Sequence, residues 1–497
     1  MRLPRIFARQ SGREDPRARS ARPASAAPWG RSGFAAAGVE HVFAGWTGAT
    51  GTLEFDLRGA LLRMRARSRE LARDNDYMKH FLQLVCSNVV GPQGVKLRVQ
   101  ARDPDGGLDE AANRLIEAAW ARWGRHGVCT ADGRLSWIEV QALAMRLIAR
   151  DGEVLLRELP GFGNGFAYAL QLIPADALDE SLHRGLTDGG EIRYGVEVDR
   201  WNRPVAYWLR VRERDRYLGT AHERVPAAQM LHLFLAEDAL QSRGLPWVHA
   251  STRRLAMLGG FEEAAITNAR VGAAKMGFFA NPEGGAFPGP DGTAADGLPQ
   301  MRADPGSFEV LPQGYTFQSF DPEYPNGETE PFLKAMLRGV AAGLGVSYTS
   351  LTGDLEGTNM SSIRAGLLEE RGVWMGLQQW LIERLHDRVF RNWLPATMTT
   401  QAVPLPLMRL EKFQQPHWFP RRWTWVDPLK DAQTAAASVA LGLQSRTALA
   451  AEQGRDIQTV MAELAEEERL AAAAGVSLAR PSAWQPIEDD EEDKDDG

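Results

Sequence analysis

Apolar residues recur at spacings of three and four in several separate stretches of the chain, a pattern that predicts amphipathic helices. The predicted helices cover residues 57–73, 77–89, 108–125, 136–150, 247–279, 331–344 and 363–393. Residues 74–76, Asp-Asn-Asp, predict a helix stop and a new cap before residue 77. Ser136 and Glu139 have the spacing of a capping box. Gly366, Gly372 and Gly376 weaken the first half of the last helix and predict a bend there.

Between residues 151 and 235 the pattern changes to short stretches rich in β-forming residues. The predicted strands cover residues 95–101, 153–158, 166–173, 192–198, 205–211 and 230–235, with a further strand-like stretch at 308–320. The clearest pairing is a hairpin in GVEVDRWNRPVAYWLRV, with its loop at residues 199–204.

The last third of the chain returns to helix after a Pro-rich link at residues 395–420. Helices are predicted at 428–443, 446–453 and 457–474. Asp427 is the expected N-cap of the first, with Pro428 in its first turn, and Gly475 is the expected end of the last.

Three segments lack any such pattern. Residues 1–54 form an Arg-rich, then Ala/Gly/Pro-rich arm, and residues 477–497 form an acidic tail; both are expected to be disordered. Residues 281–299 hold five glycines and four prolines, which predicts a loop or an exposed insert.

The charge is distributed very unevenly. The net charge is −7, and the last ten residues, EDDEEDKDDG, alone carry −7, so residues 1–487 are neutral. A protein that grips DNA through its phosphates has a basic surplus. If this chain meets DNA, we expect the contact to be loose.

The residues offer no catalytic constellation. No phosphate-binding glycine loop, nucleophile elbow or zinc-binding histidine pair is present, and the nine histidines are scattered. With two cysteines, a disulfide framework is not expected; Cys86 is predicted to be buried, and Cys129 to be a spectator in a turn. The fifteen tryptophans are interpreted as core and subunit contacts. We expect no enzyme activity, cofactor, metal or membrane span, and a protein that is assembled in a cytoplasm.

Six segments, in order, resemble the lambda-type family of tailed-phage portal proteins. They are RARSRELARDNDYMKHFLQLVCSNVVGPQGVKL, MRLIARDGEVLLREL with QLIPADALDE, GVEVDRWNRPVAYWL, SRGLPWVHASTRRLAMLGGFEEAAITNARVGAAKMGFF, LGVSYTSLTGDLEGTNMSSIRAGLLEERGVW and VDPLKDAQTAAASVALGLQSRTALAAEQGRD. The resemblance covers about residues 55–475.

The resemblance implies an α+β portal fold with wing, stem, clip and crown regions, assembled as a ring of commonly twelve copies. It implies a wing at 55–250, stem helices and clip insert at 251–345, a tunnel loop and long helix at 346–395 and a helical crown at 396–476. The ring would stand at one capsid vertex of a virion and pass double-stranded DNA without sequence specificity. The implied partners are the terminase, the head–tail connector and the capsid and scaffold proteins.

The resemblance places the tunnel loop at residues 345–362, with Tyr348, Asp354, Glu356 and Asn359 as the expected DNA-facing residues. Between residues 339 and 363 the sequence contains no Lys or Arg, whereas Asp354 and Glu356 are acidic. A loop that faces a moving polyanion gains from lacking cations, because each phosphate–cation pair would be a sticking point. The alternative is an ordinary polar surface loop.

Two other functions remain open from the sequence. One is a different virion connector or capsid ring protein, which would lack the stem and tunnel loop. The other is a hydrolase with a carboxylate pair, which the many acidic residues allow in principle.

Overall fold

The computed structural model describes residues 52–187, 189–211, 221–274, 277–280, 316–319, 329–357, 359–423, 428–476 and 478. The chain divides into two units, Met1–Thr52 and Leu53–Gly497, and the elements below belong to the second. The expected disorder of the arm and tail, the insert at 281–299 and the expected cap Asp427 lie outside the described residues.

The first helices are short and closely connected. They are α1 (Leu53–Asp56), α2 (Leu61–Asp74) and α3 (Asp76–Val85), which continues as a π-turn at Cys86–Val90. The side chain of Asn75 accepts a hydrogen bond from the Met78 N–H at 2.9 Å, which confirms the predicted stop and cap between α2 and α3. The predicted start of α2 at residue 57 is wrong, because Gly59 has φ +74° and interrupts the helix.

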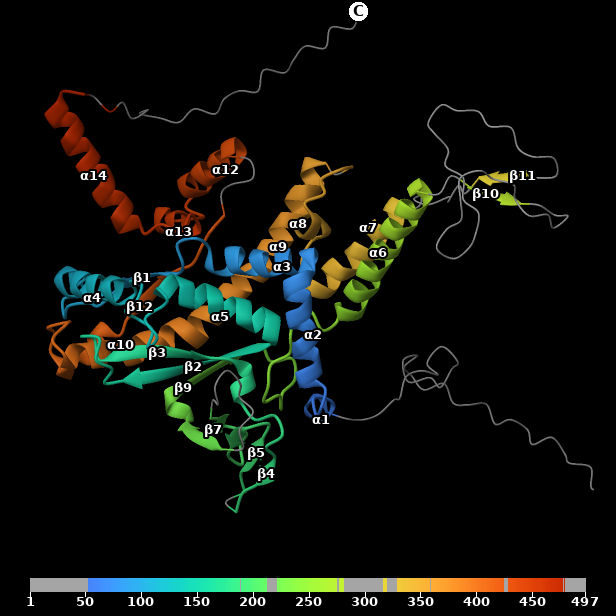
Figure 1. The fold of residues 1–497 in the computed structure, drawn as a ribbon. Coiled ribbons are helices and arrows are strands. Elements are labelled where there is room, and N and C mark those ends of the chain that lie inside the picture. The colour runs from blue at the N-terminus through green and yellow to red at the C-terminus, as the bar shows by residue number, and fades with distance from the viewer. Residues whose placement is uncertain are drawn as a thin grey trace, which may run out of the picture. The chain divides into compact units, whose positions relative to one another are not determined.

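Helix α5 (Trp137–Asp151) packs on a three-stranded antiparallel sheet, in the order β3 (Tyr168–Ile173), β2 (Glu153–Pro160), β9 (Met230–Phe234) (Figure 1). Helix α4 (Glu110–Trp123) reaches this sheet through Trp123, whose indole N–H donates to the Tyr168 carbonyl at 3.0 Å. The capping box predicted at Ser136 and Glu139 is present. Two-stranded pairing of β1 (Lys96–Val99) with β12 (Pro416–Phe419) brings together two segments that lie far apart in the sequence. The predicted Pro-rich link therefore also contains a core strand and two short helices, η7 (Leu407–Arg409) and α11 (Leu410–Phe413).

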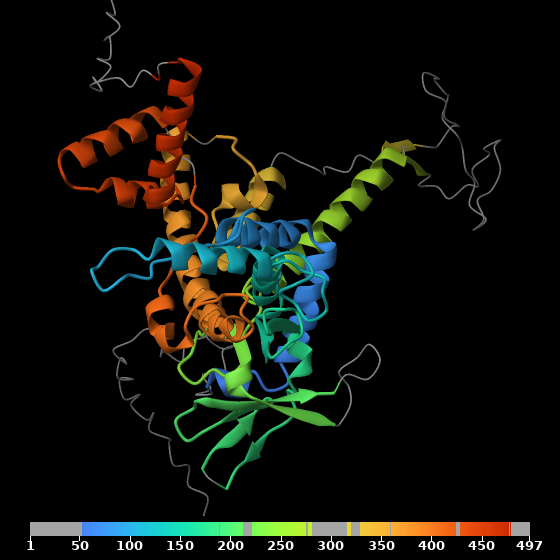
Figure 2. The ribbon, with the colours of Figure 1, turned by 90° about the vertical axis from the view of Figure 1, so that its left-hand side faces the viewer.

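A five-stranded antiparallel sheet forms a separate layer, and it shares a small core with β2, β3 and β9 (Figure 2). Its strands are β4 (Arg184–Gly185), β5 (Glu191–Arg193), β6 (Val196–Val198), β7 (Pro204–Arg210) and β8 (His222–Pro226). The single strand predicted at 192–198 is wrong: Tyr194 and Gly195 have positive φ and turn the chain between β5 and β6. The β6–β7 hairpin is confirmed, with Pro204 already in the strand.

The long helix predicted after the loop consists of α9 (Met360–Leu381), a π-turn at Ile382–His386 and α10 (Asp387–Thr399). Its departure from regular geometry lies at this π-turn, and not at the three glycines, which all lie within regular α-helix. Around α10 five buried tryptophans pack together, namely Trp120, Trp123, Trp137, Trp393 and Trp418. These tryptophans are core residues, as predicted.

The remaining helices are α6 (Thr252–Ala274) and α7 (Thr329–Leu344), which pack side by side, then α12 (Pro428–Ala440), α13 (Arg446–Glu452) and α14 (Ile457–Ala474) (Figure 1). Helix was predicted through residue 279, but Gly277–Ala280 is strand β10, paired with β11 (Thr316–Ser319). Gly475, with φ +68°, ends α14 as predicted.

The burial of the cysteines is the reverse of the prediction. Cys129 is fully buried and its pKa is raised to about 12 by burial, whereas Cys86 is half-buried. Among the described helices, none is both long and apolar enough to span a bilayer.

Candidate functional site

The segment at 345–362 is more ordered than a loop. It contains the helical turn α8 (Tyr348–Thr352), and its last residues already belong to α9. The Ser347 side chain accepts a hydrogen bond from the Ser350 N–H at 3.1 Å and caps α8, and Gly353, with φ +73°, ends it. The sequence prediction of a loop missed this turn, because a five-residue helix has too few positions to show a period.

The first half of the segment is anchored from two sides. Glu370 of α9 is buried and its Oε2 accepts hydrogen bonds from the Ser347 N–H at 3.1 Å and the Ser350 hydroxyl at 2.7 Å. Its other oxygen accepts one from Trp374 Nε1 at 3.1 Å. On the opposite side, His80 Nε2 of α3 lies 3.0 Å from the Ser350 carbonyl. These contacts fix where α8 begins.

The acidic half surrounds a lysine. Asp354 Oδ2 accepts a hydrogen bond from the Tyr348 hydroxyl at 2.8 Å, and Asp354 Oδ1 accepts one from the Glu356 N–H at 2.9 Å. Lys334 Nζ of α7 lies 3.5 Å from Asp354, 3.3 Å from Glu356 and 2.6 Å from Glu330. The Glu356 N–H, the Tyr348 hydroxyl and Lys334 together lower the pKa of Asp354.

The structure thus brings together Tyr348, Asp354 and Glu356, while Asn359 has a different role. Its side chain accepts a hydrogen bond from the Ser362 N–H at 2.7 Å and caps α9. The absence of Lys and Arg between residues 339 and 363 does not leave the segment free of cations. Lys334 pairs with its acids, and Arg338 lies over the Tyr348 ring at 5.6 Å.

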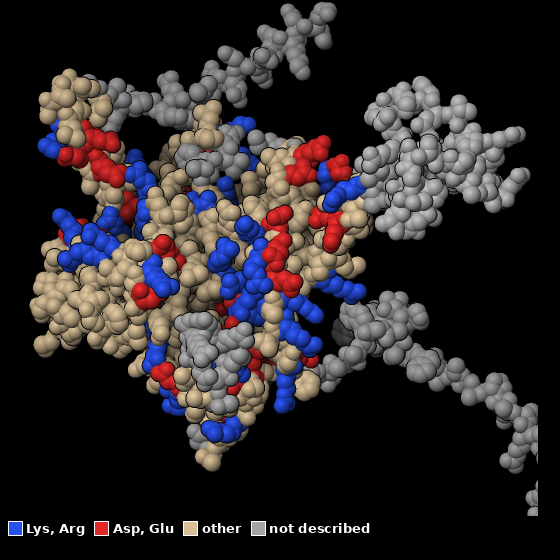
Figure 3. Space-filling view, in the orientation of Figure 1, with Lys and Arg blue, Asp and Glu red and all other residues tan. Residues whose placement is uncertain are grey.

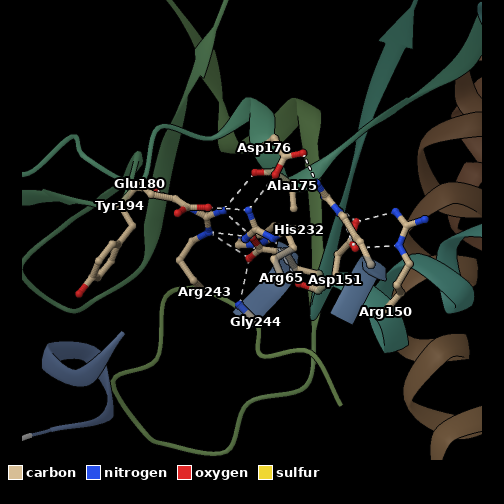
Figure 4. A network of polar contacts seen from close by, with 12 residues as sticks. Arg65, Arg150, Asp151, Ala175, Asp176, Glu180, Tyr194, His232, Arg243 and Gly244 are labelled. Atoms are coloured by element: carbon tan, nitrogen blue, oxygen red, sulfur yellow. Dashed lines mark hydrogen bonds and ion pairs between the residues drawn. The ribbon is translucent and has the colours of Figure 1, made fainter. Parts of the chain in front are cut away.

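A second charged cluster, which the sequence analysis missed, is buried between α2 and the β2 sheet (Figure 4). At its centre, Glu153 is fully buried and lies 2.9 Å from Arg65, 3.0 Å from Arg243 Nε and 2.9 Å from His232. The Gly244 N–H donates to the same carboxylate at 2.9 Å. Burial alone would raise the pKa of Glu153, but Arg243, His232 and Arg65 outweigh it and hold that pKa well below its usual range.

The cluster extends along α2 toward its surroundings. Arg65 also contacts Asp176 at 3.1 Å and Glu180 at 2.5 Å. Arg69 bridges Asp151, at the end of α5, and Asp176. No short motif joins these residues, which lie as far apart in the sequence as Arg65 and Arg243, so only the tertiary structure reveals the cluster. Its charges are paired with one another, and these pairs hold α2 against α5 and β2.

Groups of three or more His, Cys, Asp or Glu side chains with the geometry of a metal site do not occur within the described ranges.

The sequence profile for the phage portal proteins of the lambda family matches residues 41–378. The chain belongs to the lambda family of phage portal proteins. The probable portal protein of Halomonas phage phiHAP-1 is 33% identical over 444 residues, which is 87% of this chain and 86% of the relative. Portal protein B of Escherichia phage lambda is 22% identical over 479 residues, or 88% and 89% of the two chains.

A chain from the neck of an empty gene transfer agent particle has a TM-score of 0.44 and 14% identity to this portal protein, and covers 80% of this chain and 93% of its own. The Glu153 cluster and the acids Asp354 and Glu356 both lie within the residues that match the family profile. Membership of the family supports the portal function among the three functions that the sequence alone left open.

Proposed function

We propose that this portal protein assembles as a closed ring, commonly of twelve copies, through which double-stranded DNA enters and leaves a capsid. The observation that carries the proposal is the family match over residues 41–378, together with portal proteins of phages that align along almost their whole length. Cyclic assembly closes head-to-tail contacts between identical subunits. The chain acts structurally in this proposal, and no catalytic step is assigned to it.

The regions of the fold follow from the same proposal. The sheets and helices of residues 55–250 are the wing, and the paired α6 and α7 are the stem helices that carry the clip insert. The crown is proposed to be smaller than residues 396–476, because β12 lies in that range and pairs with β1 of the wing, next to α11. We therefore assign the crown to α12, α13 and α14, which bury almost none of their residues against the described chain.

The segment at 345–362 is proposed to line the tunnel, with Tyr348, Asp354, Glu356 and Asn359 toward the DNA. Two acids of the segment, Asp354 and Glu356, share the cation of Lys334 with a third acid, Glu330 of α7, so this cluster is net negative. In a ring, each net-negative cluster would repeat around the DNA and repel every phosphate equally, since the duplex carries about one charge per 1.7 Å of axis. A uniform repulsion centres the duplex without favouring one register.

The proposed site of action is the portal vertex of a virion, and the proposed partners are the terminase, the head–tail connector and the capsid and scaffold proteins. The surface supports loose contact with DNA. The face in Figure 3 carries acidic and basic atoms side by side, so it is not uniformly basic, although basic atoms gather around α2.

The ring is tested by mass. Twelve copies of 54.8 kDa give roughly 660 kDa, which mass photometry of the purified full chain resolves from smaller species. A population of only monomers and dimers at several salt concentrations would contradict the ring.

The tunnel segment is tested by packaging. Changing both Asp354 and Glu356 to Lys adds phosphate-pairing sites around the ring, so packaging should slow or stall, and more so at low salt, where charges are least screened. Since Lys334 would lose its partners in that variant, the pair Asp354→Asn and Glu356→Gln separates loss of repulsion from local rearrangement. Glu70→Lys, on the exposed side of α2, is the control for a charge reversal elsewhere on the surface.

The measurement is DNA packaged per capsid and its rate, at two salt concentrations. Ring assembly should survive in all three variants, because an exposed segment carries little of the stability of the fold. Normal packaging by the double Lys variant at both concentrations would place this segment away from the DNA.

A further inference from the structure

A pocket of about 250 Å³ lies where β1 and β12 meet the turn after α13. Three cationic side chains line it, Lys96, Arg421 and Arg422, together with the amides of Gln93 and Gln453. Among the described residues that line it, none is acidic. A concave site with converging positive charges and no acid is suited to an anion.

Sheet pairing and two glycines build this pocket. Lys96 pairs with Phe419 in the β1–β12 ladder, so Arg421 and Arg422 leave the sheet beside it. A Cβ on Gly91 would lie 2.7 Å from Arg421 Cδ, and one on Gly454 would lie 3.6 Å from Arg422 Cγ. Both glycines have positive φ, and they leave room for the arginine stems.

The two arginines are held by neutral acceptors. Arg421 Nη1 donates to the Asn88 side chain at 2.8 Å and to the Ser87 carbonyl at 2.5 Å, and Arg422 Nη1 donates to Gln378 Oε1 at 3.2 Å. Within the described residues, neither arginine forms an ion pair, and neither does Lys96. Each guanidinium therefore keeps Nε and Nη2 donors available while its position is fixed.

The positive charge in this pocket is poorly compensated. Burial lowers the pKa of both Arg421 and Arg422, and the nearby Arg371 lowers that of Arg421 further. Glu452 is the acid that counteracts this at Arg422, but it also accepts a hydrogen bond from Gln444, at 2.5 Å. Half-buried cations without a carboxylate partner destabilise a fold, and a bound anion offsets that cost.

We propose that this pocket binds an oxyanion of the phosphate class, held by Lys96, Arg421 and Arg422 with the amides of Gln93 and Gln453. The donors approach from three chain segments, and a tetrahedral group has enough oxygens to accept from all of them, whereas a carboxylate has two. Inorganic phosphate and a single backbone phosphate of DNA share this chemistry.

The test is calorimetric titration of the assembled full chain with inorganic phosphate at constant ionic strength. Lys96→Gln and Arg422→Gln should each weaken binding by about tenfold, the loss expected for one charge-assisted hydrogen bond. Lys96 is exposed and has no ion pair within the described residues, so its substitution leaves folding intact. Arg203→Gln, at an exposed position in the β6–β7 hairpin, removes the same charge elsewhere and should change nothing.

Two further arms identify the source of the phosphate. A short DNA duplex that competes with phosphate in the wild type, and not in Arg422→Gln, identifies the DNA backbone; failure to compete identifies the free ion. A peptide of sequence EDDEEDKDDG tests the carboxylate alternative. The proposal is overturned if phosphate fails to bind, if both pocket variants bind it like the wild type, or if the peptide binds more tightly than phosphate and loses affinity in the same variants.

Discussion

The Glu153 cluster and the Lys334 cluster, in which Lys334 pairs with Glu330, Asp354 and Glu356, are both built from ion pairs. The first is buried and the second is exposed to water. In the first, the side chains of Glu153 and Arg243 are 0% exposed and that of Arg65 is 1% exposed. In the second, the Lys334 side chain is 26% exposed and that of Glu356 is 79% exposed. In each cluster a cation pairs with several carboxylates, but only the centre of the first cluster is shielded from water.

This difference determines what each cluster does. Buried charges are costly to separate, so the Glu153 cluster fixes α2 against α5 and β2. Exposed pairs contribute little stability, because water and salt compete for both partners. The segment at 345–362 is therefore positioned by the buried Glu370 and by the Asn359 cap, and not by its surface ion pairs.

The largest expected effect comes from Glu153→Gln. The substitution keeps the shape of the side chain but leaves Arg243 buried without its carboxylate, at a cost of roughly 3–5 kcal/mol in the free energy of unfolding. Guanidinium unfolding of the full chain at fixed protein concentration measures it. Glu110→Gln, which removes an exposed ion pair with Arg114, is the control and should change stability by less than about 1 kcal/mol. Equal effects of the two substitutions would contradict the comparison.

In contrast to Glu153, His386 is a buried titratable group that has no ionic partner among the described residues. His386 is fully buried against Trp137 and Trp418, and burial lowers its pKa to about 4, while a hydrogen bond to the Leu381 carbonyl opposes the shift. The unfolded chain binds this proton near its usual pKa of about 6.5, so stability is complete above that pH. It then falls as pH drops toward 4, by up to about 3 kcal/mol.

His386→Gln should therefore flatten the pH dependence of unfolding between about 6.5 and 4.5. Glu153 acts in a different window: its folded pKa is depressed, so its contribution is complete above the unfolded pKa and is lost only as pH falls below it. Unfolding midpoints of the wild type and variant across this range give the measurement. An unchanged slope in His386→Gln would assign the pH dependence to another group.

The smallest effect is expected for Lys334→Gln. The side chain pairs only at the surface, so the midpoint of unfolding should stay within experimental error of the wild type. The pKa of Lys334 is raised by Glu330 and Glu356, and its loss leaves three carboxylates together. We expect more negative electrophoretic mobility without loss of stability, and a clear fall in stability would show that the exposed cluster is structural after all.

The sequence predicted helices, strands and caps well wherever local signals were long or chemically specific. Ser136 with Glu139, Asn75 and Gly475 each define a helix end through their own side chain or backbone, and the structure confirms them. The predictions failed where one or two residues determine the local backbone conformation. Tyr194 and Gly195 split a predicted strand, and the π-turn at Ile382–His386 interrupts a helix whose period continues on both sides.

The candidate site was predicted in part. Tyr348, Asp354 and Glu356 do meet, but Lys334, the cation between the acids, lies on α7 and was outside the window that the sequence suggested. Asn359 was placed among the DNA-facing residues, and the structure shows it capping α9. Its orientation toward DNA remains a prediction.

What the sequence by itself determined is the alternation of helix and strand, the neutrality of residues 1–487 beside an acidic tail, and the resemblance to a portal family, because each depends on residue type and on spacing along the chain. Tertiary structure alone decided which charges meet. Arg65, Glu153 and Arg243 become partners because β2 pairs with β9 and α2 packs on α5. Contacts between residues far apart in the sequence depend on packing in three dimensions, and no local pattern records them.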